Sequence, residues 1–374
     1  MEAIYAIGLL MMLMVFGVPV AWSFAGVLMF LVWAYDVNTT TLLLQGFRSL
    51  DSVILLALPL FVLSGYLMQS GGVAERLIRF MALLLRGRKG GMGGAMVATS
   101  GIFGAISGTA TAAVASIGTI MIDPLTERGY PRGYSAALLG MSSLLGILIP
   151  PSITLILFGV VTKQSITALF AATVVPGLLL MLGLLIFNKI MTRRILKDTP
   201  ERAAALERQR NGESASRSTL RALPALMMPV IILGGIYGGV FTPTEAAAVA
   251  AFYALLLAGL FYRSLSLATL YRVFVESARS SAAVGIVIGG AFILNFIVIT
   301  EQIPLAISAG LEGAEISPLM FLILVNVLIL LLGCVLDATT IILVIVPLFI
   351  PTCDALGIDL VHFGVLVVVN SMIG

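Results

Sequence analysis

Long runs of apolar residues, separated by short polar stretches, dominate the chain. Most runs have about 20 residues, the length that an α-helix needs to cross the hydrocarbon core of a bilayer. Strands of a membrane barrel would instead alternate apolar and polar residues over about 9–11 positions. The pattern therefore predicts an all-α integral membrane protein. Its helices are expected in residues 1–20, 20–34, 51–70, 134–161, 166–189, 223–241, 244–262, 281–299 and 362–374.

Composition supports the same class. Of the 374 residues, 60% are apolar and only 10% are charged, whereas a typical soluble domain has about 25% charged residues. The single histidine cannot supply the H-E-x-x-H site of a metalloprotease, and the chain has no G-x-x-x-x-G-K-[ST] loop of an ATP-driven pump. An aspartyl dyad needs two adjacent buried carboxylates, and Asp337 has no such neighbour in its uncharged stretch. These observations argue against an enzyme.

The positions of the basic residues predict how the chain is oriented. All but two of the 21 lysines and arginines lie in four segments, which are residues 76–89, 128–132, 189–221 and 263–279. Cytoplasmic loops of membrane proteins are enriched in Lys and Arg, so we expect these segments in the cytoplasm. The number of crossings between them then places the N-terminus on the outer side.

Two uncharged stretches are longer than one crossing needs and contain small or polar residues near their middle. Residues 90–122 lie between two basic segments, so both ends must lie on one side of the membrane. Residues 316–353 lie between acidic segments and are expected to enter from the outside. Both stretches are therefore predicted to form re-entrant helical hairpins.

The two hairpins occupy corresponding places in an internal duplication. At an offset of 228 residues, Gly146 corresponds to Gly374. The predicted repeats are residues 1–192 and 222–374, each with three crossings before its hairpin, joined by a charged linker at 193–221. An odd number of crossings inverts one repeat relative to the other. Inverted repeats with broken helices are typical of secondary transporters, whose substrate and ion sites lie near the bilayer midplane.

Within the first hairpin, 17 of the 22 residues at 98–119 are Gly, Ala, Ser or Thr, and the midpoint reads S-G-T-A-T from Ser107 to Thr111. Because Gly frees the backbone, we expect an unwound tip. Its carbonyl and hydroxyl oxygens suit a hard cation, and the N-termini of the half-helices suit an anionic group. The alternative is simple packing of helices through small residues.

A helix break follows at Pro150-Pro151, where two backbone N–H donors are missing. At membrane depth such a break is tolerated only inside protein or beside a cavity. Ser142, Ser143 and Gly146 lie on the preceding turns. We predict that Na⁺ binds between this break and the tip of the first hairpin, and a plain kink is the alternative.

Two further motifs have a structural and a functional interpretation. Asp337, deep in the uncharged second hairpin, is expected to stabilise a cation, accept a proton or orient a polar substrate group. It also fits the N-cap of a half-helix that begins at Ala338, and both roles are compatible. In the sequence FTPTEA, Thr242, Pro243 and Glu245 form a capping box, so that motif is interpreted as structural.

Together these motifs resemble a known family. The SGTAT hairpin, the GILIPPS break, GVFTPTEAAA and the G-x-x-x-D second hairpin are similar to those of the large membrane subunit of tripartite ATP-independent periplasmic (TRAP) transporters, over residues 1–374. The resemblance implies an elevator-type carrier in the bacterial inner membrane, with a periplasmic N-terminus. It also implies a Na⁺ gradient as driving force and a small organic acid, of the sialic acid or C4-dicarboxylate class, as substrate.

The resemblance implies partners and site residues as well. The partners are a separate small membrane subunit, a periplasmic substrate-binding protein and the lipid bilayer, without nucleic acid. Two or more Na⁺ ions are expected. The first ion site would use Ser107, Thr109 and backbone near Gly104, Gly146 and Pro150. The second would use Gly333, Asp337 and Thr340 with residues beyond Gly374, and the substrate would lie near Ser107, Thr109, Thr154 and Asp337.

Two other transport classes remain as alternatives. One is an ion-coupled organic-anion symporter of a related inverted-repeat fold that works without a binding protein; the FTPTEA motif argues against it. The other is a channel, because duplicated hairpins also form pores. At the repeat offset, the partner of Pro150 would lie four positions after Gly374. We therefore expect the native chain to continue for roughly 40–50 residues, the counterpart of residues 147–190.

Overall fold

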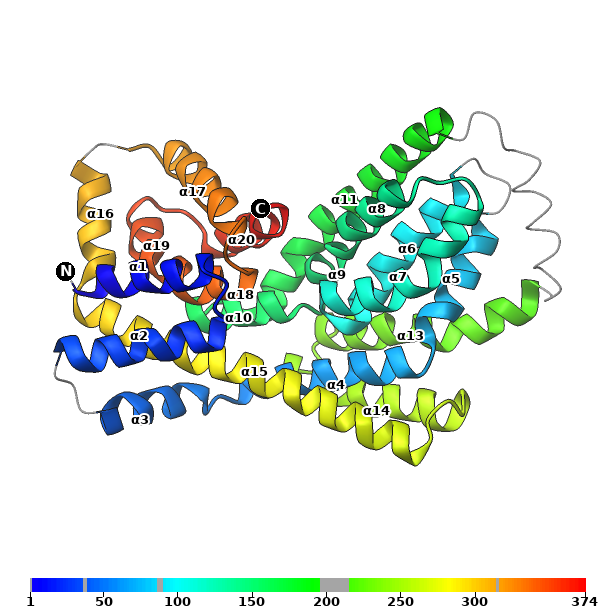
Figure 1. Cartoon of the computed structure of the whole chain (residues 1–374), viewed down its shortest axis with the longest axis horizontal. Helices are drawn as coiled ribbons and strands as arrows, with labels where there is room; N and C mark the ends of the chain where they lie inside the picture. The colour runs from blue at the N-terminus through cyan, green and yellow to red at the C-terminus, as the bar shows by residue number, and fades with distance from the viewer. Residues whose placement is uncertain (1, 36–38, 86–89, 196–214, 314–315) are drawn as a thin grey trace. The chain divides into compact units, whose positions relative to one another are not determined.

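The computed structural model describes residues 2–35, 39–85, 90–195, 215–313 and 316–374, and throughout these residues the regular structure is helical (Figure 1). The helices before the Pro150-Pro151 break are α1 (Glu2–Val15), α2 (Val20–Tyr35), α3 (Thr39–Leu50), α4 (Ala57–Ser70), α5 (Val73–Leu84), α6 (Gly91–Ser107), α7 (Ala110–Glu127), α8 (Arg132–Ser143) and α9 (Leu145–Leu148). A short 3₁₀ turn, Val53–Leu56, precedes α4. The all-α expectation is thus confirmed for the described residues.

The remaining helices follow the break. They are α10 (Ile153–Thr162), α11 (Ile166–Ile195), α13 (Ala215–Tyr237), α14 (Pro243–Leu256), α15 (Leu267–Thr300), α16 (Ile303–Gly313), α17 (Pro318–Gly333), α18 (Ala338–Thr340), α19 (Val346–Ala355) and α20 (Leu360–Ile373). Two π-helical segments, Leu257–Phe261 and Ile341–Ile345, continue α14 and α18. Most of the predicted linker at 193–221 lies outside the described residues.

Six described helices are long and apolar enough to cross a membrane by length and composition. They are Val53–Ser70, Ile166–Ile195, Thr219–Tyr237, Pro243–Phe261, Leu267–Thr300 and Ala338–Ala355. A seventh span is obtained when Arg132–Leu148 and Ile153–Thr162, which flank the proline break, are taken as one broken span. The chain is therefore a multi-pass membrane protein, as its apolar runs predict.

The helices group into two compact units that interleave along the sequence. The first unit contains Met1–Leu56, Thr154–Ala172 and Arg279–Gly374, and the second contains Ala57–Ile153 and Thr173–Ala278. In the first unit, α17 packs on α20, and α16 packs on α19. These units are defined by contacts in space, whereas the predicted repeats at 1–192 and 222–374 are defined by sequence. The division into repeats stays a prediction.

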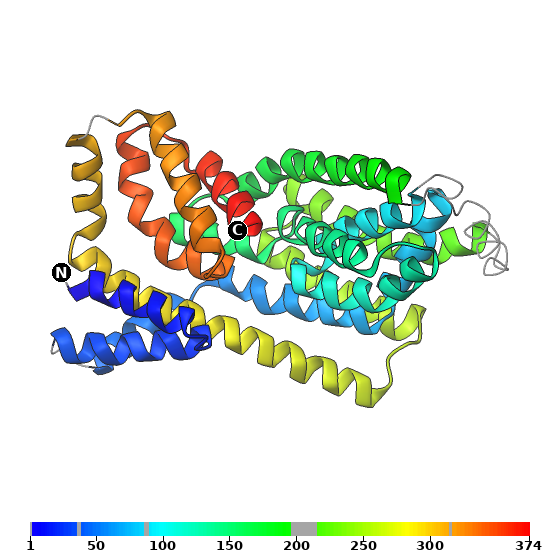
Figure 2. The same cartoon turned by 45° about the horizontal axis from the view of Figure 1, so that its top comes forward.

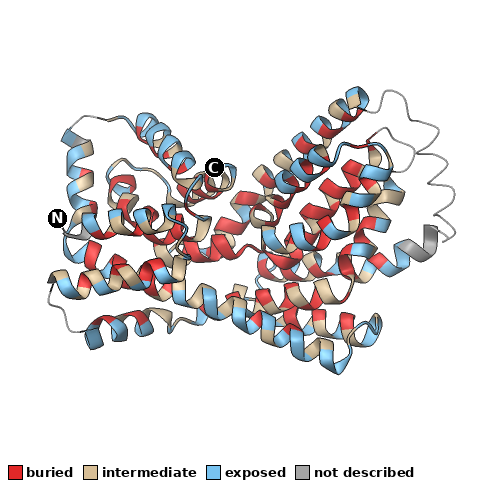
Figure 3. Cartoon of the chain, viewed as in Figure 1, coloured by how far each residue is buried: buried red, intermediate tan, exposed pale blue. Residues whose placement is uncertain are grey.

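The second unit is built around α6, which contacts α4, α5, α7, α8 and α9 (Figures 1 and 2). Most residues of α6 are buried (Figure 3). The helix can be surrounded in this way because it is rich in Gly, Ala and Ser, whose small side chains let neighbouring backbones approach closely. The first hairpin thus lies inside its unit, with α6 as its buried arm.

Both predicted hairpins are present as helix–turn–helix elements. The first arms, α6 and α17, lie within the predicted ranges 90–122 and 316–353. The second arms end slightly after these ranges, α7 at Glu127 and α19 at Ala355. The broken helix predicted at 134–161 is present as α8, α9 and α10, with its break at residues 149–152. Entry and exit of the hairpins by one face of the membrane stays a prediction.

Candidate functional site

The turn of the first hairpin is a single left-handed residue followed by an N-cap. Gly108 has φ +66°, a conformation that L-residues with a Cβ rarely adopt. Thr109 is extended, and its Oγ1 accepts a hydrogen bond of 3.4 Å from the backbone N–H of Ala112 at the start of α7. The hydroxyl of Ser107 donates to the carbonyl oxygen of Thr109 at 3.5 Å. The tip is therefore unwound over very few residues, and its polar atoms lie close together.

The turn lies directly against the proline break. A Cβ added to Gly108 would lie 3.0 Å from the carbonyl oxygen of Pro151. Pro150 and Pro151 are buried and joined by a cis peptide bond. Because proline has no N–H, the carbonyls around the break lack their usual helical donors. The structure thus brings the predicted break and the predicted tip together.

A contact between two glycines fixes this arrangement. A Cβ on Gly146 would lie 3.1 Å from the Cα of Gly104 and 3.0 Å from the carbonyl oxygen of Thr109. A Cβ on Gly65 of α4 would lie 3.3 Å from the Cα of Ser107, which precedes the turn. Predicted site residues Gly104, Ser107, Thr109 and Gly146 therefore converge. Gly65 was not predicted as a site residue, because a single glycine in an apolar helix gives no specific signal.

The two serines before the break make hydrogen bonds of their own. Ser142 Oγ donates to Ser100 Oγ at 3.1 Å, which links α8 to α6, and lies 3.1 Å from the carbonyl oxygen of Leu139. Ser143 Oγ donates to the carbonyl oxygen of Gly140 at 2.6 Å. Both serines are buried. They lie one turn before Gly146, so their predicted contribution to an ion site stays a prediction.

The second hairpin has the predicted cap. Asp337 is the N-cap of α18, and its Oδ2 accepts from the N–H of Thr339 at 3.1 Å. Its Oδ1 accepts from the hydroxyl of buried Thr340 at 2.5 Å. Asp337 itself is exposed within its unit. The capping role is thus confirmed, and it leaves the negative charge accessible for a second role.

The glycine contact of the first hairpin recurs in the second. A Cβ on Gly333, the last residue of α17, would lie 2.9 Å from the Cα of Gly374, and one on Gly374 would lie 3.0 Å from the Cα of Gly333. Gly374 is the residue that corresponds to Gly146 at the repeat offset. In each hairpin the first arm therefore packs on the following helix through a pair of glycines.

Asparagine side chains add links between helices that were not predicted. In the first unit, Asn370 of α20 donates through Nδ2 to the backbone and side-chain oxygens of Asn326 in α17. In the second unit, Asn188 Nδ2 donates to the carbonyl oxygen of Gly90 at 2.9 Å, and its Oδ1 accepts from Tyr134 at 3.1 Å. The sequence did contain a signal for these links, because lone amide side chains in apolar helices commonly form hydrogen bonds to neighbouring helices.

The remaining predicted residue, Thr154, is buried near the start of α10 in the first unit. Among the described residues, no group of three or more His, Cys, Asp or Glu side chains is placed to hold a metal ion. An ion at the first hairpin would therefore be bound mainly by carbonyl and hydroxyl oxygens, the ligands that hard cations accept.

The helices are interrupted, form two hairpins and are packed through small residues. These features are typical of membrane transporters with broken helices, and they define the class of this protein. Residues 7–374 match the family model described as "Tripartite ATP-independent periplasmic transporter, DctM component". The chain belongs to this family. The expectation of a transporter rather than an enzyme agrees with that membership.

Curated relatives support the same family. The chain is 39% identical over 350 residues to the C4-dicarboxylate TRAP transporter large permease protein DctM of Pseudomonas aeruginosa, covering 94% of this chain and 80% of that protein. It is 34% identical to the sialic acid TRAP transporter large permease protein SiaM of Vibrio cholerae, over 96% of this chain and 82% of that protein. It is 38% identical to the isethionate TRAP transporter permease protein DctMQ of Oleidesulfovibrio alaskensis, over 88% of this chain and 51% of that protein.

Proposed function

We propose that the protein carries a small organic acid across the bacterial inner membrane, driven by a Na⁺ gradient. The convergence of Gly104, Thr109 and Gly146 at the first hairpin carries this proposal. It packs an unwound turn with hydroxyl and carbonyl oxygens against a break in a second helix. Broken helices of secondary transporters hold ions and anionic substrates in such places.

Two sets of residues are proposed as Na⁺ sites. The first consists of the turn and the break, with Ser107, Thr109 and backbone near Gly104, Gly146 and Pro150, and with Ser142 and Ser143 one turn away. The second consists of Gly333, Asp337 and Thr340. Asp337 supplies the negative charge there, because its carboxylate is exposed although it also caps α18. Ion binding would order each turn before the substrate binds.

The substrate is proposed to lie near Ser107, Thr109, Thr154 and Asp337. Relatives are named for C4-dicarboxylates, sialic acid, isethionate and 2,3-diketo-L-gulonate, all of which are organic acids. No lysine or arginine lies in the described turns Ser107–Thr109 and Gly333–Asp337. The anion would therefore be stabilised by helix N-termini and by bound Na⁺.

The proposed partners are a small membrane subunit and a periplasmic substrate-binding protein. The family description names a tripartite periplasmic system, and both components follow from that description. In the proposed mechanism, the binding protein delivers the acid to the periplasmic side, where the N-terminus also lies. The hairpins and their broken helices then slide as one block past a scaffold of the other helices.

Reconstitution tests the proposal. The permease, its small subunit and its binding protein would be placed in proteoliposomes, and uptake of a panel of radiolabelled organic acids would be measured. We expect accumulation above the external concentration only with an inward Na⁺ gradient and with the binding protein present. Equal accumulation when K⁺ replaces Na⁺ would contradict the coupling. Equal accumulation without the binding protein would support an independent symporter instead.

A further inference from the structure

A pair of asparagines links the first arm of the second hairpin to α20. Asn326 is the only polar side chain of α17, a helix that is described throughout. Asn370 of α20 is 8% exposed. Its Nδ2 donates to the backbone oxygen of Asn326 and, at 3.1 Å, to the Oδ1 of the same residue. An amide in an apolar helix is costly without a partner, so these bonds favour one arrangement of α17 on α20.

The amide pair lies between two other contacts of the same helices. On one side, the rings of Phe321 and Phe363 stack with their centroids 6.4 Å apart. On the other side, Gly333 and Gly374 meet through their backbones. Apolar contacts alone hold helices weakly in a bilayer, because lipid tails are equally apolar, so hydrogen bonds and small residues specify the packing. The amide pair therefore helps to set how Gly333 meets Gly374.

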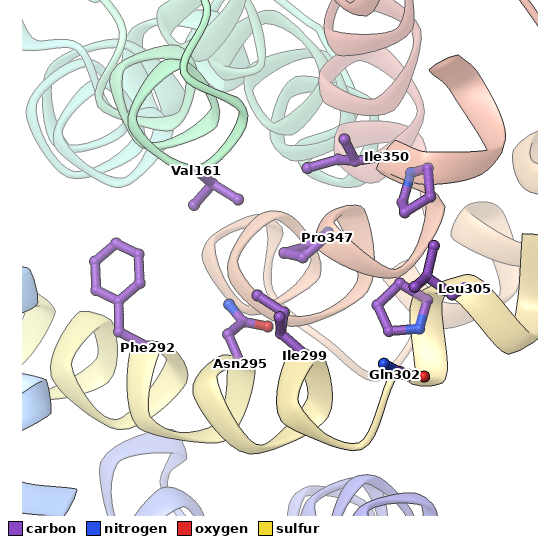
Figure 4. Close-up of a pocket in the computed structure, with 10 residues that line it drawn as sticks. Val161, Phe292, Asn295, Ile299, Gln302, Leu305, Pro347 and Ile350 are labelled. Carbon is purple, nitrogen blue, oxygen red and sulfur yellow. The ribbon is translucent and has the colours of Figure 1, made fainter. Parts of the chain in front are cut away.

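The second arm of the hairpin is held by an amide from a different helix. Asn295 of α15 is 6% exposed, and its Nδ2 donates to the carbonyl oxygen of Leu343 in the π-helical segment that continues α18. Figure 4 shows Asn295 pointing from α15 towards the segment that contains Pro347. With the second arm bound to α15, the contact of α17 with α20 decides where the first arm lies.

The position of the first arm matters at the second proposed Na⁺ site. Gly333 ends α17, and Asp337, the N-cap of α18, follows four residues later. A shift of α17 on α20 would move the carbonyl oxygen of Gly333 relative to the Asp337 carboxylate. Asn326 lies seven residues before Gly333, which is about 10.5 Å along the helix. Its effect on the site would therefore act through the position of α17.

We propose that Asn326 and Asn370 are positioning residues for the second Na⁺ site, because their hydrogen bonds hold α17 on α20 in the arrangement that binds the ion. The inference rests on the proposed function, since it requires that Na⁺ site. Loss of the bonds lowers the fraction of protein in the binding arrangement, and the apparent Na⁺ affinity falls with that fraction.

Graded variants test the pair in the assembled transporter. Asn370→Leu removes both interhelical bonds, whereas Asn326→Leu removes the bond to Oδ1 and leaves the backbone oxygen in place. Uptake into proteoliposomes would be measured against Na⁺ concentration, with the small subunit and the binding protein present. Because one neutral hydrogen bond corresponds to about a 3- to 10-fold change in an equilibrium, we expect the half-saturating Na⁺ concentration to rise about threefold in Asn326→Leu. In Asn370→Leu it should rise about tenfold or more, and uptake at saturating Na⁺ should stay near the wild-type rate in both.

Tyr253→Phe is the matched control. It removes a 2.7 Å bond from the Tyr253 hydroxyl to the carbonyl oxygen of Pro224, which links α14 to α13 in the second unit. This variant should lower the melting temperature without changing the half-saturating Na⁺ concentration, and so separates lost stability from lost ion affinity.

The outcomes distinguish the inference from the function on which it rests. Wild-type uptake that does not depend on Na⁺ would contradict the proposed function itself. Na⁺-dependent wild-type uptake with an unchanged half-saturating concentration in Asn370→Leu would overturn the inference. A rise in Asn370→Leu with no change in Asn326→Leu would also overturn it, because Asn370 would then act without its partner. If Asn370→Leu does not fold, the value in Asn326→Leu decides alone.

Discussion

Gly104 of α6 and Gly146 of α9 lie so close that neither position has room for a side chain. A Cβ on Gly146 would be 3.1 Å from the Cα of Gly104, and the atom it meets is backbone, which cannot rotate away. The turn of the first hairpin therefore rests on the helix break through main chain alone. This contact sets how near Thr109 and the break come to each other.

Alanine at either glycine is expected to push the two helices apart. Overpacking of a close contact costs about 1–3 kcal/mol, so Gly104→Ala and Gly146→Ala should lower thermal stability and reduce Na⁺-dependent uptake. Gly140→Ala on α8 is the matched control, because nothing lies within 4 Å of its added Cβ. Melting temperature and initial uptake rate would be measured together. Wild-type uptake in both variants would show that the close contact is not needed.

Substitutions of Asp337 separate its charge from its capping role. Asn is as good an N-cap as Asp, so Asp337→Asn should keep the helix start and lose Na⁺ dependence. Asp337→Ala should lose both the helix cap and the Na⁺ dependence, and the lost cap should lower stability by about 1 kcal/mol. Asp359→Asn is the control, because Asp359 caps α20 through a 2.8 Å bond from the N–H of His362. Unchanged Na⁺-dependent uptake in Asp337→Asn would reduce Asp337 to a structural cap.

Asn188 forms a cluster with Gly90, Tyr134 and Thr192, which is expected to stabilise the start of the first hairpin. Asn188 is 2% exposed, and its oxygen also accepts from the hydroxyl of Thr192 at 3.3 Å. Asn188→Ala would remove three hydrogen bonds, at about 1 kcal/mol each, although the oxygen of Gly90 keeps its bond of 2.9 Å from the N–H of Gly94. Tyr134→Phe keeps the bonds of Asn188 to Gly90 and Thr192, and should cost about 1 kcal/mol. The unfolding of both variants in detergent would be compared with that of the wild type. Stabilities equal to that of the wild type would contradict a stabilising role for the cluster.

The capping box of α14 is expected to matter for stability alone. The Thr242 side chain accepts from the N–H of Glu245 at 3.3 Å, and Glu245 accepts from the N–H of Thr242 at 2.8 Å. Thr242→Ala should cost about 1 kcal/mol, whereas Thr242→Ser and Glu245→Gln keep the motif. The half-saturating Na⁺ concentration of uptake should be the same in all three. A shift in that concentration would give the motif a role in ion binding.

Features that depend on local chemistry could be predicted from the sequence. Gly108 at the turn, the proline break and the Thr242 capping box each follow from the conformations that Gly, Pro and Thr allow over a few residues. The amphipathic helices α3 and α5 were not predicted as elements, because their apolar positions are interrupted by charged and polar residues and form no continuous run.

Long-range partners could not be predicted in the same way. Asn295 and Leu343 are 48 residues apart in the sequence, and the π-helical segment that contains Leu343 reads as an ordinary apolar run. The contact of Gly65 with the hairpin turn likewise depends on how α4 packs, which no local pattern specifies. The amides were visible in the sequence as lone polar residues, but their partners were not.

The Na⁺ dependence of uptake in variants of Thr109 tests the central claim most directly. Thr109→Val removes the hydroxyl at the turn, Thr109→Ser keeps it, and Thr119→Val removes a hydroxyl that bonds only within α7, to Ala115 at 3.0 Å and Ser116 at 3.2 Å. Because a hydrogen bond or ligand to a charged group contributes about 1.5–3 kcal/mol, Thr109→Val should raise the half-saturating Na⁺ concentration about tenfold or more. Thr109→Ser and Thr119→Val should stay near the wild-type value. An unchanged value in Thr109→Val, with normal uptake, would contradict an ion site at the first hairpin.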